Sequence, residues 1–155
     1  MSDFEINEAD VLVIHGPNLN MLGMREPHIY GSITLAEIDE KLIIQGNELG
    51  LSITCFQSNY EGEIVTVIQK AFKKIKGLII NPAAYTHTSV AVRDAVSMLD
   101  VPIVEIHLSN IHKREPFRHH SYFADISEGR IAGFGAYGYT LALAGLYEMM
   151  KQKPV

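Results

Sequence analysis

Five short apolar segments lie along the chain, and longer amphipathic segments separate them. The apolar segments are VLVIHG (11–16), LSITCF (51–56), GLII (77–80), PIVEIHL (102–108) and RIAGFG (130–135). Most of them are rich in β-branched residues and nearly continuous in hydrophobicity, which is typical of parallel strands covered on both faces. The pattern therefore predicts five strands of a parallel sheet.

The segments between the strands have helical periodicity. We predict helices over about 35–49 and 62–76, a third from residues 86–89 to just before 101, and a last one over about 138–151. Thr34 and Glu37 have the spacing of a capping box, and Gly50 can terminate the first helix. The last helix is apolar on nearly every side, so we expect another part of the assembly, such as a second subunit, to cover it.

The alternation of strands and helices predicts an α/β fold. Right-handed crossovers give a flavodoxin-like, doubly wound, five-stranded parallel sheet with helices on both faces. Ligands of such sheets bind beyond the carboxyl ends of the strands. Four polar segments emerge there, namely GPNLNMLGMREPHIYGS (16–32), QSNYEGE (57–63), NPAAYTHTS (81–89) and SNIHKREPFRHHS (109–121). We expect several of these loops to build one site.

Length and composition restrict the classes of protein to consider. The chain has 155 residues, of which 47% are hydrophobic and 20% charged, and its formal charge is −5. We expect one domain over 1–155, with residues 1–9 as a loosely ordered N-terminal extension. The negative charge argues against non-specific binding of nucleic acid.

The sequence also favours a cytoplasmic location. The single cysteine, Cys55, excludes an internal disulfide and fits a reducing compartment. It lies in an apolar segment, so we interpret it as a buried, inert thiol rather than a nucleophile. The acidic N-terminus lacks the features of a signal peptide, and the longest uncharged stretch, 131–147, is too short for a membrane span.

Two patterns suggest cofactors, and we favour a structural interpretation of both. GFGAYG (133–138) matches the GxGxxG fingerprint, but no later strand carries the acid that would bind a ribose. We therefore expect these glycines to let the last helix pack closely on the sheet. The seven histidines include HLSNIHKREPFRHH (107–120), which has none of the spacings of zinc sites. Acid–base or hydrogen-bonding histidines fit better.

Glu105 and His107 form a more specific pattern. They are two residues apart in a predicted strand, so they share one face of the sheet. A carboxylate beside an imidazole fixes its tautomer and favours its protonated form, which makes His107 a candidate general acid. On this pattern alone, a purely structural hydrogen-bonded pair is an equal alternative.

The loops after the third and fourth strands carry candidate binding groups. Asn81 can orient a carbonyl or hydroxyl, and His87 lies near a helix N-terminus, which suits anionic groups. Ser109 and Arg118 suit a clamp for a carboxylate or hydroxyl. Ordinary helix capping and a solvated basic loop are the alternatives.

The long first loop contains Arg25 and Tyr30. A phenol with a pKa of about 10 is a poor base at neutral pH, but a neighbouring guanidinium favours the phenolate. Gly16, Gly23 and Gly31 would let such a loop move as a lid. An irregular surface loop with a packed tyrosine is the alternative.

Taken together, the loop sequences resemble the type II 3-dehydroquinate dehydratases. The resemblance rests on GPNLNMLGMREPHIYG, FQSNYEGE, NPAAYTHTS with VAVRDA, VPIVEIHLSNIHKREPFRHHS and GFGAYGYTLAL, in order over about 10–150. It implies a flavodoxin-like hydro-lyase of the shikimate pathway of aromatic amino-acid biosynthesis. This enzyme reversibly removes water from 3-dehydroquinate to give 3-dehydroshikimate, by anti elimination through an enolate, without a metal or organic cofactor.

The resemblance also implies catalytic roles for individual residues. Tyr30 is the base that removes the proton beside the ketone, and Arg25 helps to keep it ionised. Asn18 helps to stabilise the enolate. His107, paired with Glu105, gives a proton to the departing hydroxyl.

The resemblance implies a set of binding residues and an assembly as well. The substrate's carboxylate and hydroxyls are held by Asn81, His87, Ser109 and Arg118, with help from the backbone of Leu108 and Ser109. The family assembles as a homododecamer of four trimers, in which Asp94 reaches the site of a neighbouring subunit. Ala83 and Ala84 stand where some members of the family have glycines.

Two other functions remain as alternatives. A Schiff-base dehydratase would need a lysine in the site, and only Lys113 lies in a loop that follows a strand. A non-enzymatic module of the same fold would bind a flavin or carry an acidic cluster after the first strand, where this chain has HGPNLN.

Overall fold

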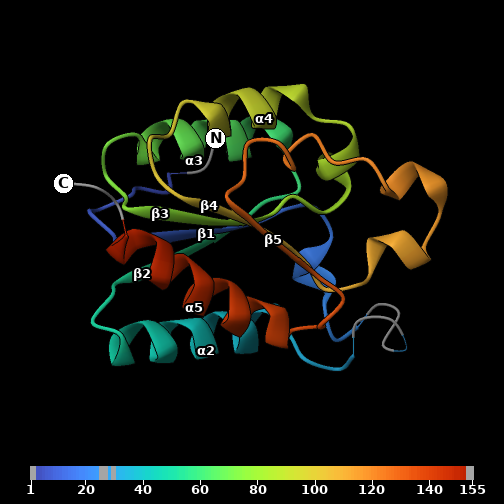
Figure 1. The fold of residues 1–155 in the computed structure, drawn as a ribbon, viewed down its shortest axis with the longest axis horizontal. Helices are drawn as coiled ribbons and strands as arrows, with labels where there is room; N and C mark the ends of the chain where they lie inside the picture. Colours follow the sequence, from blue (N-terminus) through green and yellow to red (C-terminus); the bar gives the residue numbers. More distant parts are fainter. Residues whose placement is uncertain (1–2, 25–27, 29–30, 153–155) are drawn as a thin grey trace.

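The sheet has the predicted architecture. The computed structural model describes residues 3–24, 28 and 31–152. Its strands are β1 (Val11–His15), β2 (Ile53–Gln57), β3 (Gly77–Asn81), β4 (Ile103–His107) and β5 (Gly129–Ala132). All pair in parallel in the order β2-β1-β3-β4-β5, the order of flavodoxin-like folds (Figure 1). The predicted fold class is therefore confirmed.

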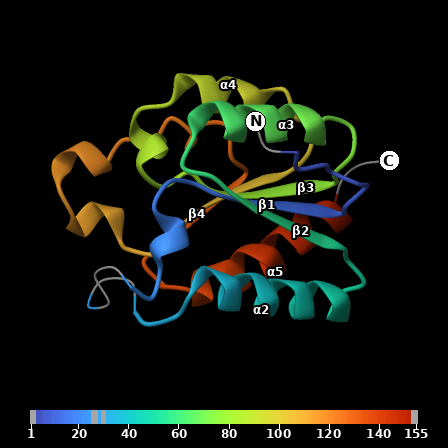
Figure 2. The ribbon, with the colours of Figure 1, turned by 180° about the vertical axis from the view of Figure 1, so that it is seen from behind.

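Helices cover both faces of the sheet. α2 (Leu35–Glu48) and α5 (Tyr137–Lys151) lie on one face, and α3 (Glu61–Ala71) and α4 (Val90–Ser97) lie on the other (Figures 1 and 2). In the described parts of the loops there are four short 3-10 helices, namely η1 (Leu19–Met21), η2 (Ala83–His87), η3 (Ile111–Lys113) and η4 (Pro116–Arg118).

The helix ends follow local chemistry. The Thr34–Glu37 capping box that begins α2 is present, and Gly50 adopts a left-handed φ of 73° after the helix. α3 ends at Ala71, five residues before its predicted end at 76, because Phe72 leaves the helical conformation with a ψ of 122° and Lys73 has a φ of 62°. The third predicted helix begins only at Val90, where the Ser89 side chain accepts a hydrogen bond from Val92.

Alternate residues of the strands enter two cores. Leu12 and Ile14 of β1 face α3 and α4, whereas Val11 and Val13 face α2 and α5. On α5, buried residues such as Leu143 pack against this second core. The sheet and α2 therefore cover part of the apolar surface of α5 within one chain, while Tyr137 at its start is 62% exposed.

The described part of the N-terminal extension lies against the core. From residue 4 onward it packs on the core, since the Phe4 ring contacts Phe56 and the Ile6 side chain is buried. Lys70 donates a hydrogen bond to the backbone oxygen of Phe4, which fastens the segment to α3. Apolar side chains at these positions account for this packing.

Two glycines permit close approaches that shape the site. A Cβ on Gly16 would lie 2.4 Å from the Pro82 backbone oxygen, so only glycine fits where the ends of β1 and β3 meet. A Cβ on Gly138 would lie 3.1 Å from Ile106, which explains the tight packing of α5 on the sheet. This supports the structural interpretation of GFGAYG. None of the described helices is long and apolar enough to cross a membrane.

Candidate active site

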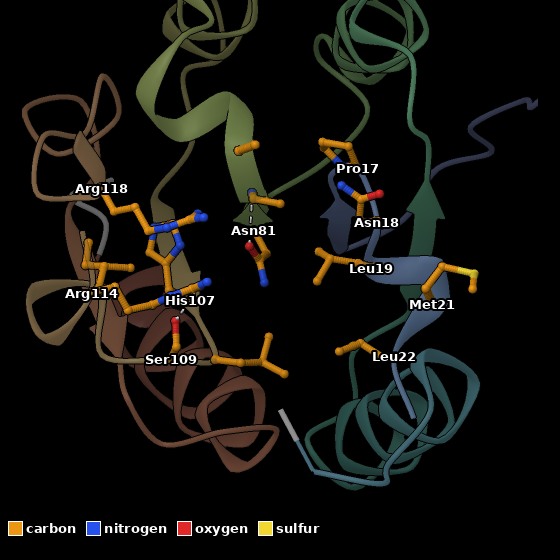
Figure 3. A pocket seen from close by; sticks show the side chains of 14 residues that line it. Pro17, Asn18, Leu19, Met21, Leu22, Asn81, His107, Ser109, Arg114 and Arg118 are labelled. Atoms are coloured by element: carbon orange, nitrogen blue, oxygen red, sulfur yellow. Dashed lines mark hydrogen bonds between the residues drawn. The ribbon is translucent and has the colours of Figure 1, made fainter. Parts of the chain in front are cut away.

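A cavity opens at the carboxyl ends of β1, β3 and β4. Its lining comes from the last residues of β3 and β4 and from the loops that follow the three strands, as the strand topology predicted (Figure 3). The lining residues are Pro17, Asn18, Leu19, Met21, Leu22, Asn81, Ala83, Ala84, His107, Leu108, Ser109, Ile111, Arg114 and Arg118. Six of the predicted site residues are therefore together: Asn18, Asn81, His107, Leu108, Ser109 and Arg118.

His107 lies at the end of β4 with one ring nitrogen engaged. Its Nε2 lies 2.9 Å from Oε1 of Glu105, and both residues are buried. A carboxylate only accepts hydrogen bonds, so Nε2 carries a proton and donates it to Glu105. The predicted pair is present, and Nδ1 is the nitrogen that remains for chemistry in the cavity.

Two further side chains hold Glu105. The Ser121 hydroxyl donates to Oε1 at 2.5 Å, and the Arg130 guanidinium donates to Oε2 from the neighbouring position on β5. Burial alone would raise the pKa of the Glu105 carboxyl, but the hydrogen bonds from His107, Ser121 and Arg130 outweigh it. The pKa therefore lies below its ordinary value of 4.5. Glu105 thus remains an anion that fixes the His107 ring.

Two asparagines lie on other walls of the cavity. Asn18 has a left-handed φ of 69°, and its backbone N–H donates to Oδ1 of Asn59 at 2.9 Å. Such backbone conformations are rare outside glycine and occur often at functional sites. The Oδ1 of Asn81 accepts a hydrogen bond from the Ala83 N–H at 3.1 Å. Ala83 itself has a φ of 51°, a conformation that favours glycine.

The remaining wall is positively charged. Arg114 and Arg118 lie near His107 and Ser109, facing Leu19 and Leu22 across the cavity (Figure 3). Arg114 approaches the Ser109 hydroxyl at 3.4 Å, and Arg118 pairs with Glu115 at 2.6 Å. Among the described residues that line the cavity there is no acid. The cavity therefore suits an anionic, hydroxyl-bearing ligand.

Two predicted binding residues do not line the cavity. His87 donates from Nδ1 to the His120 carbonyl at 2.6 Å, and its pKa is lowered chiefly by burial, with smaller effects from nearby His107 and Arg118. Asp94 is exposed on α4. Arg25 and Tyr30, together with the expected motion of their loop, lie outside the described residues.

The sequence did not single out several side chains that support the site. Arg130 could have been found from the parallel register, which places it beside Glu105 once β5 is paired with β4. Arg114 is part of the basic loop, but no pattern separates it from Lys113. Ser121 had no local signal at all, because a long loop brings it back to β4.

One group of potential metal ligands exists among the described residues, and it lies outside the cavity lining. It comprises His15, Asp39 and Cys55, whose ligand atoms lie within 4.8 Å of one another. The imidazole already makes hydrogen bonds at both nitrogens, to Asp39 and Tyr139. Burial, followed by the Asp39 charge, raises the pKa of the Cys55 thiol, which fits the predicted inert cysteine.

The lowered pKa of Glu105 predicts a loss of stability in acid. A group with a depressed folded-state pKa stabilises the fold above its unfolded pKa, and this contribution disappears as the pH falls through the folded value. We expect the urea midpoint of the wild type to fall more steeply between about pH 5 and pH 3 than that of Glu105→Gln. Glu148→Gln, a substitution on the exposed side of α5, is the control and should retain the wild-type slope. Equal slopes for wild type and Glu105→Gln would contradict the assignment.

Comparisons with known proteins agree on one relationship. The family model described as "Dehydroquinase class II" matches residues 9–147. The chain is 57% identical over 143 residues to the 3-dehydroquinate dehydratase of Hydrogenovibrio crunogenus, covering 92% of this chain and 99% of that protein. It is 52% identical over 143 residues to the enzyme of the same name from Haemophilus influenzae (strain Rd), covering 92% and 96%. The crystal structure of type II dehydroquinase from Propionibacterium acnes superposes with a TM-score of 0.86 at 41% identity, covering 94% of this chain and 99% of that one.

Proposed function

This chain belongs to the class II dehydroquinase family, and we propose that the cavity at the ends of β1, β3 and β4 is its active site. The chain is a 3-dehydroquinate dehydratase, a hydro-lyase that converts 3-dehydroquinate into 3-dehydroshikimate and water. The observation that carries the assignment of the site is the buried Glu105–His107 pair, which opens into a cavity with two arginines and no described acid. The substrate is a polyhydroxylated carboxylate, which such a cavity suits.

In this proposal His107 is the general acid. Its Nε2–H is held by Glu105, so the protonated imidazole gives the proton on Nδ1 to the departing hydroxyl. The C–O bond breaks as the enolate collapses to the conjugated enone, and the hydroxyl leaves as water. Because Glu105 remains ionised, it stabilises the positive charge of the ring before the transfer and fixes its orientation throughout.

Tyr30 is the proposed base, and Arg25 is the cation that favours its phenolate form. The phenolate removes the proton beside the ketone, and the electron pair moves onto the carbonyl oxygen to form the enolate. Asn18, whose strained backbone places it on the cavity wall, is proposed to stabilise the enolate oxygen.

The remaining lining residues are proposed to hold the substrate. Ser109, the backbone of Leu108 and the amide of Asn81 would bind the carboxylate, and Arg118 would bind a hydroxyl. His87 is proposed to join them through Nε2, because its Nδ1 is bound to the His120 carbonyl. Lys113, the lysine that a Schiff-base mechanism would need, is exposed and does not line the cavity.

The proposed setting is a cytoplasmic homododecamer of four trimers in the shikimate pathway. The free thiol of Cys55 is consistent with a reducing compartment. We further propose that residues 1–155 act as a single catalytic domain, since both hydrophobic cores share one sheet. Asp94 supports the assembly, because its exposed position on α4 suits a contribution to a neighbouring subunit's site.

The reaction is tested by mixing the purified chain with 3-dehydroquinate and following the absorbance of the conjugated enone. Growth of this absorbance is the expected result, and its absence would contradict the function. Borohydride added with the substrate should not trap a covalent adduct. Trapping would favour a Schiff-base mechanism instead.

The shared site predicts complementation between two impaired variants. Asp94→Ala is expected to impair turnover, although the residue lies outside the cavity of its own chain. When Asp94→Ala and Tyr30→Phe chains are unfolded together and refolded, mixed trimers contain some sites with both residues intact. We therefore expect partial recovery of activity, measured against each variant refolded alone. An active monomer in sedimentation, or no recovery in verified mixed trimers when Asp94→Ala alone is impaired, would contradict the shared site.

A further inference from the structure

A row of four polar side chains runs from the cavity through the core to α2. Nδ2 of Asn81 on β3 lies 3.2 Å from the hydroxyl of Tyr139 on α5. That hydroxyl lies 2.8 Å from Nδ1 of His15 on β1, and Nε2 of His15 lies 2.8 Å from Oδ1 of Asp39 on α2. His15, Asn81 and Tyr139 are at most 2% exposed, whereas the Asp39 side chain is 28% exposed. The row thus touches solvent at Asp39 and the cavity at Asn81.

The chemistry of these groups determines which atom donates and which accepts in each hydrogen bond of this row. The Asn81 amide nitrogen can only donate, so the Tyr139 oxygen accepts. Burial raises the pKa of Tyr139 far above its ordinary value, so the phenol keeps its proton and donates it to Nδ1 of His15. The His15 proton is then on Nε2, which donates to the Asp39 carboxylate. Each bond in the row has one donor and one acceptor.

These hydrogen bonds fix the orientation of the Asn81 amide. Its Oδ1 accepts from the Ala83 N–H at 3.1 Å, and its Nδ2 donates to Tyr139. Turning the amide over would place its NH₂ group against the Ala83 N–H, so two donors would face each other. The second N–H on Nδ2 is left for a ligand of the cavity. The amide therefore presents a donor, which is the group that a carboxylate requires.

Burying these four polar side chains costs desolvation free energy, which apolar side chains of similar size would avoid. Tyr139 belongs to the mainly apolar core that the sheet shares with α2 and α5, and His15, which bonds to it, is fully buried. Polar groups placed there lose their hydration, and only a complete set of hydrogen bonds compensates for it. The set is complete, and it ends on a residue of the cavity wall.

We propose that Tyr139, His15 and Asp39 are positioning residues for the dehydration, acting through Asn81 by holding its amide nitrogen toward the substrate carboxylate. This inference rests on the proposed function. It assigns roles to three residues that lie outside the cavity and touch neither the substrate nor the reacting atoms.

The test is the substitution Tyr139→Phe, which keeps the ring and removes the hydroxyl. Asn81 then loses its acceptor, and we expect KM for 3-dehydroquinate to rise about fivefold or more, the scale of one lost hydrogen bond. kcat should change much less, because the acid and the base are untouched. Tyr147→Phe makes the same change on the same helix, away from the row, and should leave KM and kcat at wild-type values.

A double-mutant cycle separates positioning from general damage. Asn81→Ala should also raise KM, and adding Tyr139→Phe to it should raise KM no further, because Tyr139 acts only through the amide. Multiplication of the two effects would show that Tyr139 acts through the fold instead, and would overturn the proposal.

Asp39 provides a second test at the partly exposed end, which does not depend on Tyr139→Phe folding. Asp39→Ala should raise KM, and Asp39→Asn, which keeps an acceptor oxygen for His15, should raise it less. Equal KM values for wild type, Asp39→Ala and Asp39→Asn would remove Asp39 from the row. If the wild type turns over and Tyr139→Phe matches Tyr147→Phe, the positioning role alone is wrong. If the wild type does not turn over, the proposed function is wrong and the positioning role falls with it.

Discussion

Replacement of His107 by alanine is expected to lower kcat at least about 100-fold, the lower scale for positioned proton transfer. The departing hydroxyl is a poor leaving group unless it receives a proton as the C–O bond breaks. Among the described residues of the cavity, His107 is the side chain that can supply this proton near neutral pH, because the arginines do not release theirs. The effect should appear in kcat rather than in KM, because the transfer occurs only in the transition state.

The control for this substitution is His112→Ala. His112 is an exposed histidine of the same loop region and does not line the cavity, so its loss should leave kcat unchanged. Circular dichroism and urea unfolding would establish that the His107 variant is folded. If His107→Ala retains a normal kcat and only KM rises, the residue binds substrate and the acid must be sought elsewhere.

The supporting residues of His107 show where inference from the sequence ends. The pairing of Glu105 with His107 was predictable, because strand periodicity alone places residues two apart on one face. The pairing of Glu105 with Arg130 depends on which strand lies beside β4 and in what register, and Ser121 depends on the path of an irregular loop. These contacts are long-range, so no local pattern in the sequence contains them.

Most of the fold could be predicted from the sequence, because it depends on local patterns. Continuous β-branched runs and capped amphipathic helices are local signals, and right-handed crossovers leave few topologies for them. The prediction was wrong at the end of α3. The helix stops at Ala71 because Lys73 takes a left-handed conformation, although the helical pattern continues to residue 76.

The row from Asp39 to Asn81 contains one contact that the sheet pattern predicts and others that depend on long-range packing. His15 and Asn81 end neighbouring parallel strands in matched register, so a sequence-based model of the sheet already places them side by side. Tyr139 comes from α5 and Asp39 from α2, and only the packing of α2 beside α5 brings these two helices to the same strand ends. The proposed site residues thus lie at strand ends and in the loops that follow them, whereas their support is drawn from distant parts of the chain.

None of the described residues that line the cavity is suited to be the base of the reaction. The described lining of the cavity offers amides, a serine, arginines and His107, and His107 is the proposed acid. Amides and serine are far too weak as bases near neutral pH, and arginine is permanently charged. The segment after Met24 supplies three ionisable groups that can take a proton, Glu26, His28 and Tyr30. A phenolate is the strongest base of the three, and the Arg25 charge favours its formation.

Tyr30→Phe is therefore expected to reduce kcat by about 10³-fold or more, toward the upper range for general base catalysis, since the ring is retained and only the reacting oxygen is lost. The enone assay measures the rate, and Glu26→Gln is the matched control that should leave most of kcat. Arg25→Gln should lower kcat less and shift the alkaline rise of activity to higher pH, because the phenolate loses the cation that stabilises it. The reverse pattern, with Glu26→Gln inactive and Tyr30→Phe close to wild type, would move the base to Glu26. An unchanged pH profile in Arg25→Gln would leave Tyr30 as the base but remove Arg25 from its ionisation.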